Sequence, residues 1–269
     1  MKARKRKIFS TLFTAVLVIS LSLGAAIPVA AQTTWYVDDD NCPGPGTGTE
    51  ADPFCSIQNA IDAADTGDTI NVATGAYDLE ASIRVDKSLS IMGDIDNPEN
   101  VLINAGTIPI NSGSKPPDRD KDAFQVAANN VVIRGFKIIN AVNVPIGAGD
   151  GWQNAAITVG GDITLLDWIE PWNVPLLIDG GTFSNNIIED CTFGIYLAMS
   201  KNVTVSNNTI RNCSFSGITN WNTKYWGVYQ DPVGNVIEGN LIENCVVEGI
   251  CLGAEESFSV SGTVIRNKT

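Results

Sequence analysis

Hydrophobic and polar residues in the second half of the chain alternate over three to five positions and then break at Asn or Gly. One ten-residue unit recurs, reading TFSNNIIEDC from residue 182, TVSNNTIRNC from 204, VIEGNLIENC from 236 and SVSGTVIRNK from 259. A weaker copy, VIRGFKIINA, starts at residue 132. An amphipathic helix would need apolar residues at three-to-four spacing over a longer stretch. The pattern therefore predicts short strands separated by turns.

The last positions of the four units lie 22, 32 and 23 residues apart. Units of this length cannot each enclose a core, so they must stack as parallel strands, with equivalent residues about 4.8 Å apart. We expect an aliphatic stack made of Ile188, Ile210, Ile242 and Ile265. We expect a polar ladder at the following turn, made of Asn140, Asp190, Asn212, Asn244 and Asn267.

Three cysteines, Cys191, Cys213 and Cys245, share the last position of the unit. The strand spacing would allow disulfides, but parallel Cβ directions disfavour them. We therefore expect a column of free thiols that fill the core as small apolar side chains. Cys251 follows Ile250 and should point the opposite way, and its partner stays open. Three units continue with a Gly-Ile pair, at Gly194-Ile195, Gly217-Ile218 and Gly249-Ile250.

The N-terminal half fits the same architecture. Residues 56–64 place Ile57, Ala60, Ile61 and Ala64 on one helical face, with Ser56 as the N-cap. A single short amphipathic helix must cover something apolar, and the open end of a strand stack supplies it. Short alternating strands follow, with inward pairs Ile70/Val72, Ile83/Val85, Leu89/Ile91 and Val101/Ile103.

The first 31 residues have the pattern of a signal peptide: a basic start, an apolar run from Ile8 to about Val29, and small residues ending at Ala31. The alternative is a retained membrane anchor, because the run is long enough to span a bilayer. We expect a cut after Ala31 and a secreted or cell-surface protein that has no membrane contact afterwards. The predicted organisation is residues 1–31 signal peptide, 32–67 N-terminal strand, disulfide loop and capping helix, and 68–269 parallel β-helix.

Six cysteines in an exported chain can be oxidised. Cys42 and Cys55 flank the loop Pro43-Gly44-Pro45-Gly46, which has no hydrophobic periodicity. A loop without a core gains most from a covalent link. We therefore predict a disulfide between Cys42 and Cys55.

Charge and composition exclude several kinds of function. The chain carries 17 Lys and Arg against 30 Asp and Glu, a formal charge of −13, which argues against nucleic-acid partners. There is no histidine, which excludes Ser-His-Asp and Cys-His nucleophile systems and a His-ligated zinc or copper site. Any acid–base chemistry must use carboxylates, Lys, Arg, Tyr or water.

Residues 35–79, WYVDDDNCPGPGTGTEADPFCSIQNAIDAADTGDTINVATGAYDL, resemble the N-terminal cap and first coil of the pectin-lyase-like superfamily. The later units resemble the generic parallel β-helix repeat of that superfamily. The resemblance implies an all-β fold, a right-handed parallel β-helix (solenoid) with a short N-terminal capping α-helix. It is weak for activity, because this fold carries lyases, hydrolases, epimerases, adhesins and non-enzymes. The His-containing hydrolase motif and the Asp-His and Arg-Pro-x-x-Arg signatures of pectate lyases are missing, while a lyase with a Lys base and bound calcium stays compatible.

Two insertions interrupt the repeat, at about 161–181 and 220–233, and both follow strands of the Gly-Ile type. They would bracket a groove about 10 Å wide, two strand spacings. Aromatic side chains suit stacking on sugar rings, although they could instead fold back and hold their own loops in place. The predicted carbohydrate-binding residues are Trp168, Trp172, Trp221, Tyr225, Trp226 and Tyr229.

Two acidic clusters are candidates for metal binding or for solvated turns. Asp38, Asp39 and Asp40 could supply oxygen ligands to calcium, or form a polar turn before the disulfide loop. The run from Asp118 to Asp122 alternates in sign, which is typical of a solvated loop. Calcium is the one cofactor that the residues suggest.

Two functions compete. The first is an exported scaffold without catalysis that binds a polysaccharide or a cell-surface glycan. The second is a calcium-dependent uronate lyase, with Lys201 or Lys224 as base and Glu170 or Asp231 as calcium ligands. The last unit stops inside a repeat, so we also expect an exposed apolar rung at that end, for further coils or an end-to-end partner.

Overall fold

The structure, a computed structural model, describes residues 31–109, 122–142, 154–160, 177–198, 200–222, 233–254 and 264–266; for 221–222, 254 and 264–266 it describes the backbone alone. Contacts divide the chain into Met1–Ala31 and a compact unit, Gln32–Thr269. Among the described residues, no helix is long and apolar enough to cross a membrane.

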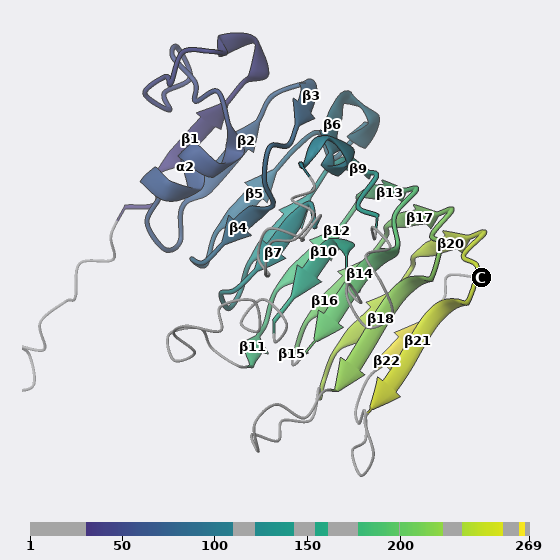
Figure 1. Ribbon diagram of the computed structural model, residues 1–269. Helices are drawn as coiled ribbons and strands as arrows, with labels where there is room; N and C mark the ends of the chain where they lie inside the picture. The colour runs from purple at the N-terminus through teal and green to yellow at the C-terminus, as the bar shows by residue number, and fades with distance from the viewer. Residues whose placement is uncertain are drawn as a thin grey trace, which may run out of the picture. The chain divides into compact units, whose positions relative to one another are not determined.

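The compact unit is built of parallel strands, which stack coil upon coil into three long sheets (Figure 1). Sheet 1 consists of β1 (Thr34–Val37), β2 (Thr69–Val72), β5 (Ser90–Met92), β8 (Val132–Arg134), β12 (Thr182–Ser184), β16 (Thr204–Ser206), β19 (Val236–Glu238) and β22 (Val264–Arg266). Sheet 2 consists of β3 (Gly75–Asp78), β6 (Val101–Asn104), β9 (Lys137–Ile139), β13 (Ile187–Glu189), β17 (Thr209–Arg211) and β20 (Leu241–Glu243). Sheet 3 consists of β4 (Ile83–Val85), β7 (Phe124–Val126), β10 (Ala155–Val159), β14 (Phe193–Ala198), β18 (Ser216–Asn222) and β21 (Glu248–Ala254). Strands β11 (Ile178–Asp179) and β15 (Ser200–Lys201) form a fourth, two-stranded pair.

Each coil contributes one strand to each sheet, so equivalent repeat positions stack as predicted. Ile188, Ile210 and Ile242 are in register across β13, β17 and β20. The prediction for Ile265 is wrong, because β22 pairs with β19 and brings Ile265 opposite Ile237 in sheet 1. The sequence Val-Ile-Arg fits the pattern of either strand, so the sequence alone did not distinguish them.

A capping helix covers the N-terminal end of the stack. Helix α2 (Ile57–Ala63) begins at Ser56, whose hydroxyl accepts a hydrogen bond from the Asn59 N–H at 3.2 Å. Ile57, Ala60 and Ile61 are buried against β1, β2 and β4. Lys87 closes the other end, because its Nζ donates to the carbonyls of Ile61, Asp62 and Ala64 at 2.8–3.0 Å.

Asp68 joins β1 to the capping region. Its carboxylate accepts hydrogen bonds from the Thr33 N–H, the Trp35 indole and the Asp65 N–H, at 2.8–2.9 Å. Burial works to raise the pKa of Asp68, but these bonds outweigh it and the pKa is lowered.

We expect Asp68→Asn to lower the free energy of unfolding by about 1–2 kcal/mol at pH 7, because the Asn amide faces donors. A carboxylate with a lowered folded-state pKa stabilises the fold above its unfolded-state pKa, and loses this contribution as the pH falls through the folded-state pKa. Thermal melting of both proteins between pH 7 and pH 2 measures the effect. The gap between their melting temperatures should shrink at the acid end, and a constant gap would contradict the role given to the charge.

The Cys42–Cys55 disulfide is present, with Cα atoms 4.9 Å apart, as predicted. The column of free thiols is also confirmed, since Cys191 and Cys213 are buried and unbridged and Cys245 lies behind them, half-buried. Burial raises the pKa of Cys191 to about 12, so this thiol is neutral and unreactive at ordinary pH. Cys251 points away from this column, in register with Thr219.

Asparagines form two ladders at the turns. The predicted ladder is present at Asn140, Asp190, Asn212 and Asn244, all with positive φ between 55° and 63°. Asn, with Asp, is the residue after Gly that best tolerates this region. A second, buried ladder was missed: the Asn186 and Asn208 side chains each donate to the side-chain oxygen of the next, ending at Asn240, at 2.9–3.1 Å. The same oxygens also accept backbone N–H groups, so this ladder closes the turn between sheets 1 and 2.

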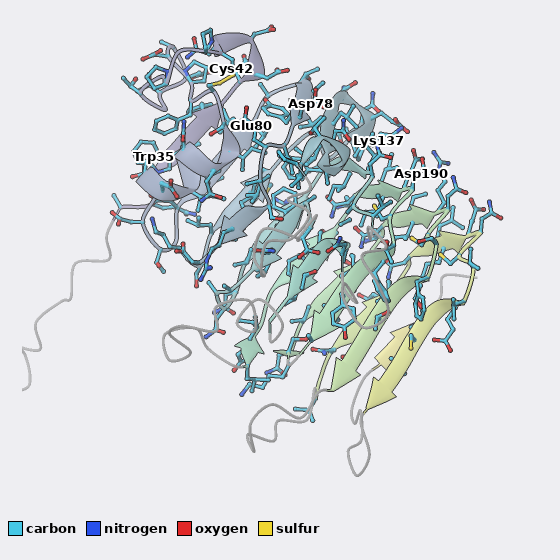
Figure 2. All side chains as sticks on the ribbon, in the orientation of Figure 1. Trp35, Cys42, Asp78, Glu80, Lys137 and Asp190 are labelled. Atoms are coloured by element: carbon cyan, nitrogen blue, oxygen red, sulfur yellow. A yellow bond between two sulfur atoms is a disulfide. The ribbon has the colours of Figure 1, made fainter. Side chains whose placement is uncertain are left out.

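An ion-pair network crosses the outer side of sheet 2. Lys137 Nζ lies 2.6 Å from Glu99 Oε2 and 3.2 Å from Glu189 Oε2, and Arg211 also pairs with Glu189. Burial works to raise the pKa of Glu189, but the bonds from Lys137 and Arg211 outweigh it and the pKa is lowered. Figure 2 labels Lys137 and Asp190 along this sheet. These charges are satisfied by one another, and we assign them a structural role.

In the last described coil, large apolar side chains on β20, on β21 and in the turn between them are 45–76% exposed, namely Leu241, Val246, Val247 and Leu252. The core side chains of this coil, Ile242, Cys245 and Ile250, are only partly buried, whereas their counterparts one coil earlier, Ile210, Cys213 and Ile218, are fully buried. This agrees with the exposed apolar rung predicted at the C-terminal end.

Candidate functional site

The outer face of sheet 3 carries buried polar side chains that do not belong to the hydrophobic core. Ile157, Ile195 and Ile218 belong to the main core. The next residue on each strand points outward, and Thr158, Tyr196, Thr219 and Cys251 stand in register across β10, β14, β18 and β21. Ala155, Phe193, Tyr196 and Ala198 form an apolar cluster apart from the main core. We name this region the sheet 3 face.

Asp122 organises one end of the sheet 3 face. Its Oδ1 accepts hydrogen bonds from the Ala155 N–H at 2.7 Å and the Thr158 hydroxyl at 2.9 Å, and its Oδ2 accepts one from Gln125 at 3.2 Å. Asp122 is 5% exposed, so the solvated loop expected here is wrong for this residue. A buried carboxylate is retained because three donors satisfy it. Residues 118–121 lie outside the described part of the chain.

Two hydroxyls at the centre of the face have no hydrogen-bond partner. Ser216 Oγ and Thr219 Oγ1 are fully buried and unpartnered, the two such side-chain atoms in the described residues. Ser216 is 0% and Thr219 is 2% exposed. An unpaired buried hydroxyl costs about 1–3 kcal/mol, so a fold that keeps two on one strand carries a penalty that a hydrogen-bonding partner would remove.

An aromatic edge borders these hydroxyls. The Phe193 ring lies 5.4 Å from the Tyr196 ring and 4.9 Å from the Phe215 ring, centroid to centroid. Phe193 and Tyr196 are buried, while Phe215 is 40% exposed. Two of the three rings are thus buried, and the third is open to solvent. We call the outward polar groups of the sheet 3 face beside these rings the polar floor.

Strand β21 pairs with β18 on the side away from β14 and contributes the next outward side chains of the floor. Glu248 is the register partner of Ser216 and is exposed, and Cys251 is the partner of Thr219. Burial, followed by a hydrogen bond with Glu248, raises the pKa of Cys251 to about 12. Cys251 is therefore a neutral thiol, and Glu248 is the open carboxylate of the site.

The structure confirms the strand order that the predicted groove requires. Strands β10 and β18 both pair with β14, so these two strands are two strand spacings apart, about 10 Å. The backbone of Trp221 lies on β18, and its side chain is not described. The remaining candidates in these segments lie outside the described residues: Trp168, Glu170, Trp172, Lys224, Tyr225, Trp226, Tyr229 and Asp231.

Two further sets of candidates have structural roles. Lys201 Nζ lies 3.2 Å from Asp179 Oδ2, so this proposed base is ion-paired. Asp38 accepts a hydrogen bond from the Asp40 N–H and Asp39 one from the Ala76 N–H. Asp38 and Asp39 thus take part in the polar turn, and no group of three or more Cys, Asp or Glu placed to hold a metal ion occurs in the described residues.

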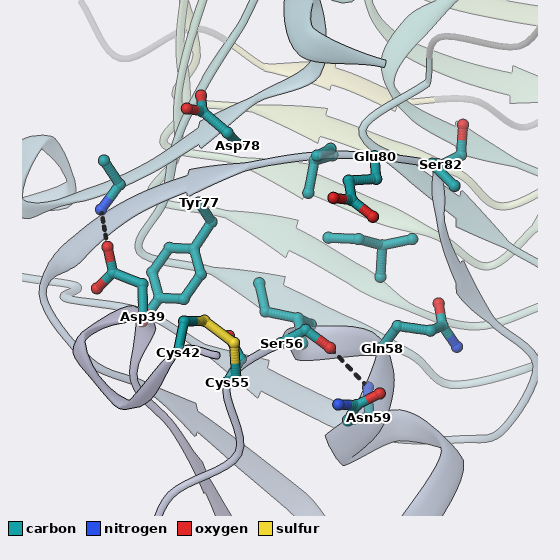
Figure 3. Close-up of a pocket in the computed structure, with 15 residues that line it drawn as sticks. Asp39, Cys42, Cys55, Ser56, Gln58, Asn59, Tyr77, Asp78, Glu80 and Ser82 are labelled. Atoms are coloured by element: carbon teal, nitrogen blue, oxygen red, sulfur yellow. Dashed lines mark hydrogen bonds between the residues drawn. A yellow bond between two sulfur atoms is a disulfide. The ribbon is translucent and has the colours of Figure 1, made fainter. Parts of the chain in front are cut away.

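A cavity of about 640 Å³ lies at the N-terminal cap, lined by the Cys42–Cys55 disulfide, the start of α2 and the connection from β3 to β4. Figure 3 shows Asp39, Asp78 and Glu80 around it. Asp39 binds a backbone N–H and Asp78 accepts a hydrogen bond from Asn104, at 2.9 and 2.8 Å. Asp39 thus ties the cap turn to β3, and Asp78 joins β3 to β6. The sheet 3 face, with its unpartnered hydroxyls, is the stronger candidate.

Comparison with protein families gives a match over residues 41–268 to the model described as "Protein of unknown function (DUF1565)". The chain belongs to this family. The sequence matches none of the curated proteins with which it was compared. The family assignment therefore fixes the lineage of the fold and leaves the activity open.

Solved structures show the fold. The GH136 lacto-N-biosidase from Eubacterium ramulus aligns with a TM-score of 0.54 and 14% identity, over 81% of this chain and 42% of that one. Escherichia coli YbhC aligns with a TM-score of 0.50 and 14% identity, over 89% and 72%. A rhamnogalacturonan lyase aligns with a TM-score of 0.48 and 16% identity, over 82% and 62%. The chain thus spans less than two thirds of the first and last of these. This DUF1565 protein has the parallel β-helix fold that the resemblance of residues 35–79 implied.

The polar residues of the sheet 3 face were missed at first, although a signal was present. In each coil the residue after the core isoleucine is the outward one, as in Ile157-Thr158 and Ile218-Thr219. The Gly-Ile repeat marks the core position, and the residue that follows it marks the outward column. The lack of a partner for Ser216 and Thr219 has no sequence signal, because it depends on contacts across the sheet.

Proposed function

We propose that this DUF1565 protein is an exported scaffold that binds a glycan at the sheet 3 face without catalysing a reaction. The observation that carries the proposal is the pair of buried, unpartnered hydroxyls of Ser216 and Thr219 beside an aromatic edge. Sugars present hydroxyl groups next to apolar ring faces, which is the complement of this arrangement. Export rests on the signal-peptide pattern of residues 1–31 and agrees with the Cys42–Cys55 disulfide.

The polar floor supports binding over chemistry. Catalysis by acid and base needs two groups with matched pKa values on opposite sides of a bond. The described floor has Asp122, which three donors hold as a carboxylate, and Glu248, which is exposed. None of the described groups on this floor is a free base of the kind that a lyase requires. Lys201, the described candidate for that base, is ion-paired with Asp179.

The test uses Thr219→Val, which keeps the shape of the side chain and removes its hydroxyl. Binding is measured by affinity electrophoresis and calorimetry against soluble glucans, mannans, galactans, arabinans, polygalacturonate and alginate. We expect the wild type to bind at least one of these, and Thr219→Val and Ser216→Ala to weaken that binding at least fivefold. Their thermal stability should stay equal or rise by about 1 kcal/mol, because each removes an unpaired buried hydroxyl.

Thr158→Val is the matched control, because Thr158 stands in the same outward column but donates to Asp122. It should lose about 1 kcal/mol of stability, the opposite sign to Thr219→Val. A folded wild type that binds nothing on the panel, or a Thr219→Val protein with undiminished binding, would refute the proposal. If uronate samples that contain calcium develop the ultraviolet absorbance of unsaturated products, the protein is a lyase and this proposal is wrong.

A further inference from the structure

We propose that the glycan segment bound over Ser216 and Thr219 is uncharged, and that the sheet 3 face rejects uronates. This inference rests on the proposed function and specifies the class of its ligand. The observation behind it is the charge on the face. The outward side chains described on β7, β10, β14, β18 and β21, with Asp122, comprise carboxylates, hydroxyls, an amide, a thiol, aromatic rings and alanines, and none is a Lys or Arg.

The cations whose side chains are described are engaged or distant. Lys201 pairs with Asp179, while Lys137 and Arg211 pair with Glu189 on sheet 2. Lys87 binds carbonyls at the end of α2 and Arg134 contacts Met92 on sheet 1.

Arg84 is the nearest cation on sheet 3 itself. It lies on β4, four strands from β18 in the sheet order, which is about 19 Å at the strand spacing. That exceeds the screening length of roughly 8 Å at physiological salt. Arg84 therefore cannot pair with a carboxylate placed over Thr219, and Lys201 is already paired with Asp179.

The two carboxylates of the face act against an anionic ligand. Glu248 is the register partner of Ser216, one strand spacing away, and Asp122 is a buried acceptor at the other end of the face. Repulsion between like charges grows as the surroundings become less polar. The unpartnered groups are hydroxyls, which donate and accept at once, so they match sugar hydroxyls on both counts.

The experiment compares polymers that share a sugar backbone and differ in whether C6 carries a charged carboxylate or a neutral group. Methyl-esterified homogalacturonan is tested against the same polymer after de-esterification, and polygalacturonate and alginate against their carboxyl-reduced, neutral products, all in EDTA. We expect the neutral member of a pair to bind at least tenfold more tightly. Raising the salt from low to high should narrow this ratio, because screening weakens the repulsion.

Two charge-removing variants locate the effect. Glu248→Gln should raise the affinity for the charged member at least threefold. Asp190→Asn removes the same charge from an exposed turn of sheet 2, at a positive φ of 55° that Asn accepts, and should leave the ratio unchanged. Equal or tighter binding of the charged members would overturn this inference while leaving glycan binding intact. Binding of no member of any pair, together with no binding on the wider panel, would overturn the proposed function itself and this inference with it.

Discussion

Asn208→Ala is expected to lower the free energy of unfolding by about 3 kcal/mol, because it opens the buried asparagine ladder in the middle. Asn208 Oδ1 accepts from the backbone and side-chain N–H groups of Asn186, at 3.0 and 3.1 Å. Its amide donates to the Phe183 carbonyl and to Asn240 Oδ1, both at 2.9 Å. Asn208 is 1% exposed, so alanine would leave these donors and acceptors without a hydrogen-bond partner in the interior of the stack. Urea denaturation followed by circular dichroism measures the loss.

The adjacent Asn207 offers a matched control. It is exposed and has a positive φ of 55°, which glycine adopts freely. Its backbone N–H donates to the Glu238 carbonyl at 3.1 Å, a bond that Asn207→Gly retains. We expect Asn207→Gly to cost less than about 1 kcal/mol. Similar losses for the two variants would show that the buried ladder contributes no more than an ordinary turn residue.

Gly217→Ala is expected to lower the free energy of unfolding by about 2–3 kcal/mol through overpacking. A Cβ at this position would lie 2.5 Å from Ile242 Cγ2 and 2.7 Å from the Gly249 carbonyl oxygen. The carbonyl belongs to the neighbouring strand of sheet 3, so it cannot move without disturbing the pairing of β18 and β21. Thermal and urea denaturation measure the effect.

Gly249→Ala gives the opposite expectation one coil later. The nearest atom to its added Cβ would be Ile242 Cγ2, at 3.8 Å, an ordinary contact. We expect no loss, or a gain of about 0.5 kcal/mol, because alanine restricts the unfolded chain. If both glycine variants were tolerated, the close approach of successive coils would not be what requires glycine in the Gly-Ile pairs.

The architecture could be predicted because its causes are local and repeated. Alternation over three residues, Asn at the turns and a capped amphipathic helix each act within a few positions, and the stack multiplies them. The sequence therefore predicts correctly the helix N-cap at Ser56, the Cys42–Cys55 disulfide and the free, buried thiols of Cys191 and Cys213. Ile265 was assigned to the wrong sheet because Val-Ile-Arg satisfies two strand positions equally well.

The candidate site was predicted less well. The order of the strands that precede the two insertions follows from the repeat, and it is confirmed at β10, β14 and β18. Asp122 was assigned to a solvated loop because its acceptor role depends on Thr158 and Ala155, 36 and 33 residues further along the chain. The partners of a buried carboxylate cannot be read from its neighbours in sequence.

By itself, the sequence determined the parallel β-helix, its N-terminal cap, its disulfide and its net negative charge, since periodicity and composition act on each coil alone. Only the tertiary structure decided which outward groups meet on sheet 3, and that Ser216 and Thr219 remain without partners there. Hydrogen bonding of a buried group depends on atoms from neighbouring coils, here β14 and β21 beside β18, which become its neighbours when the chain stacks.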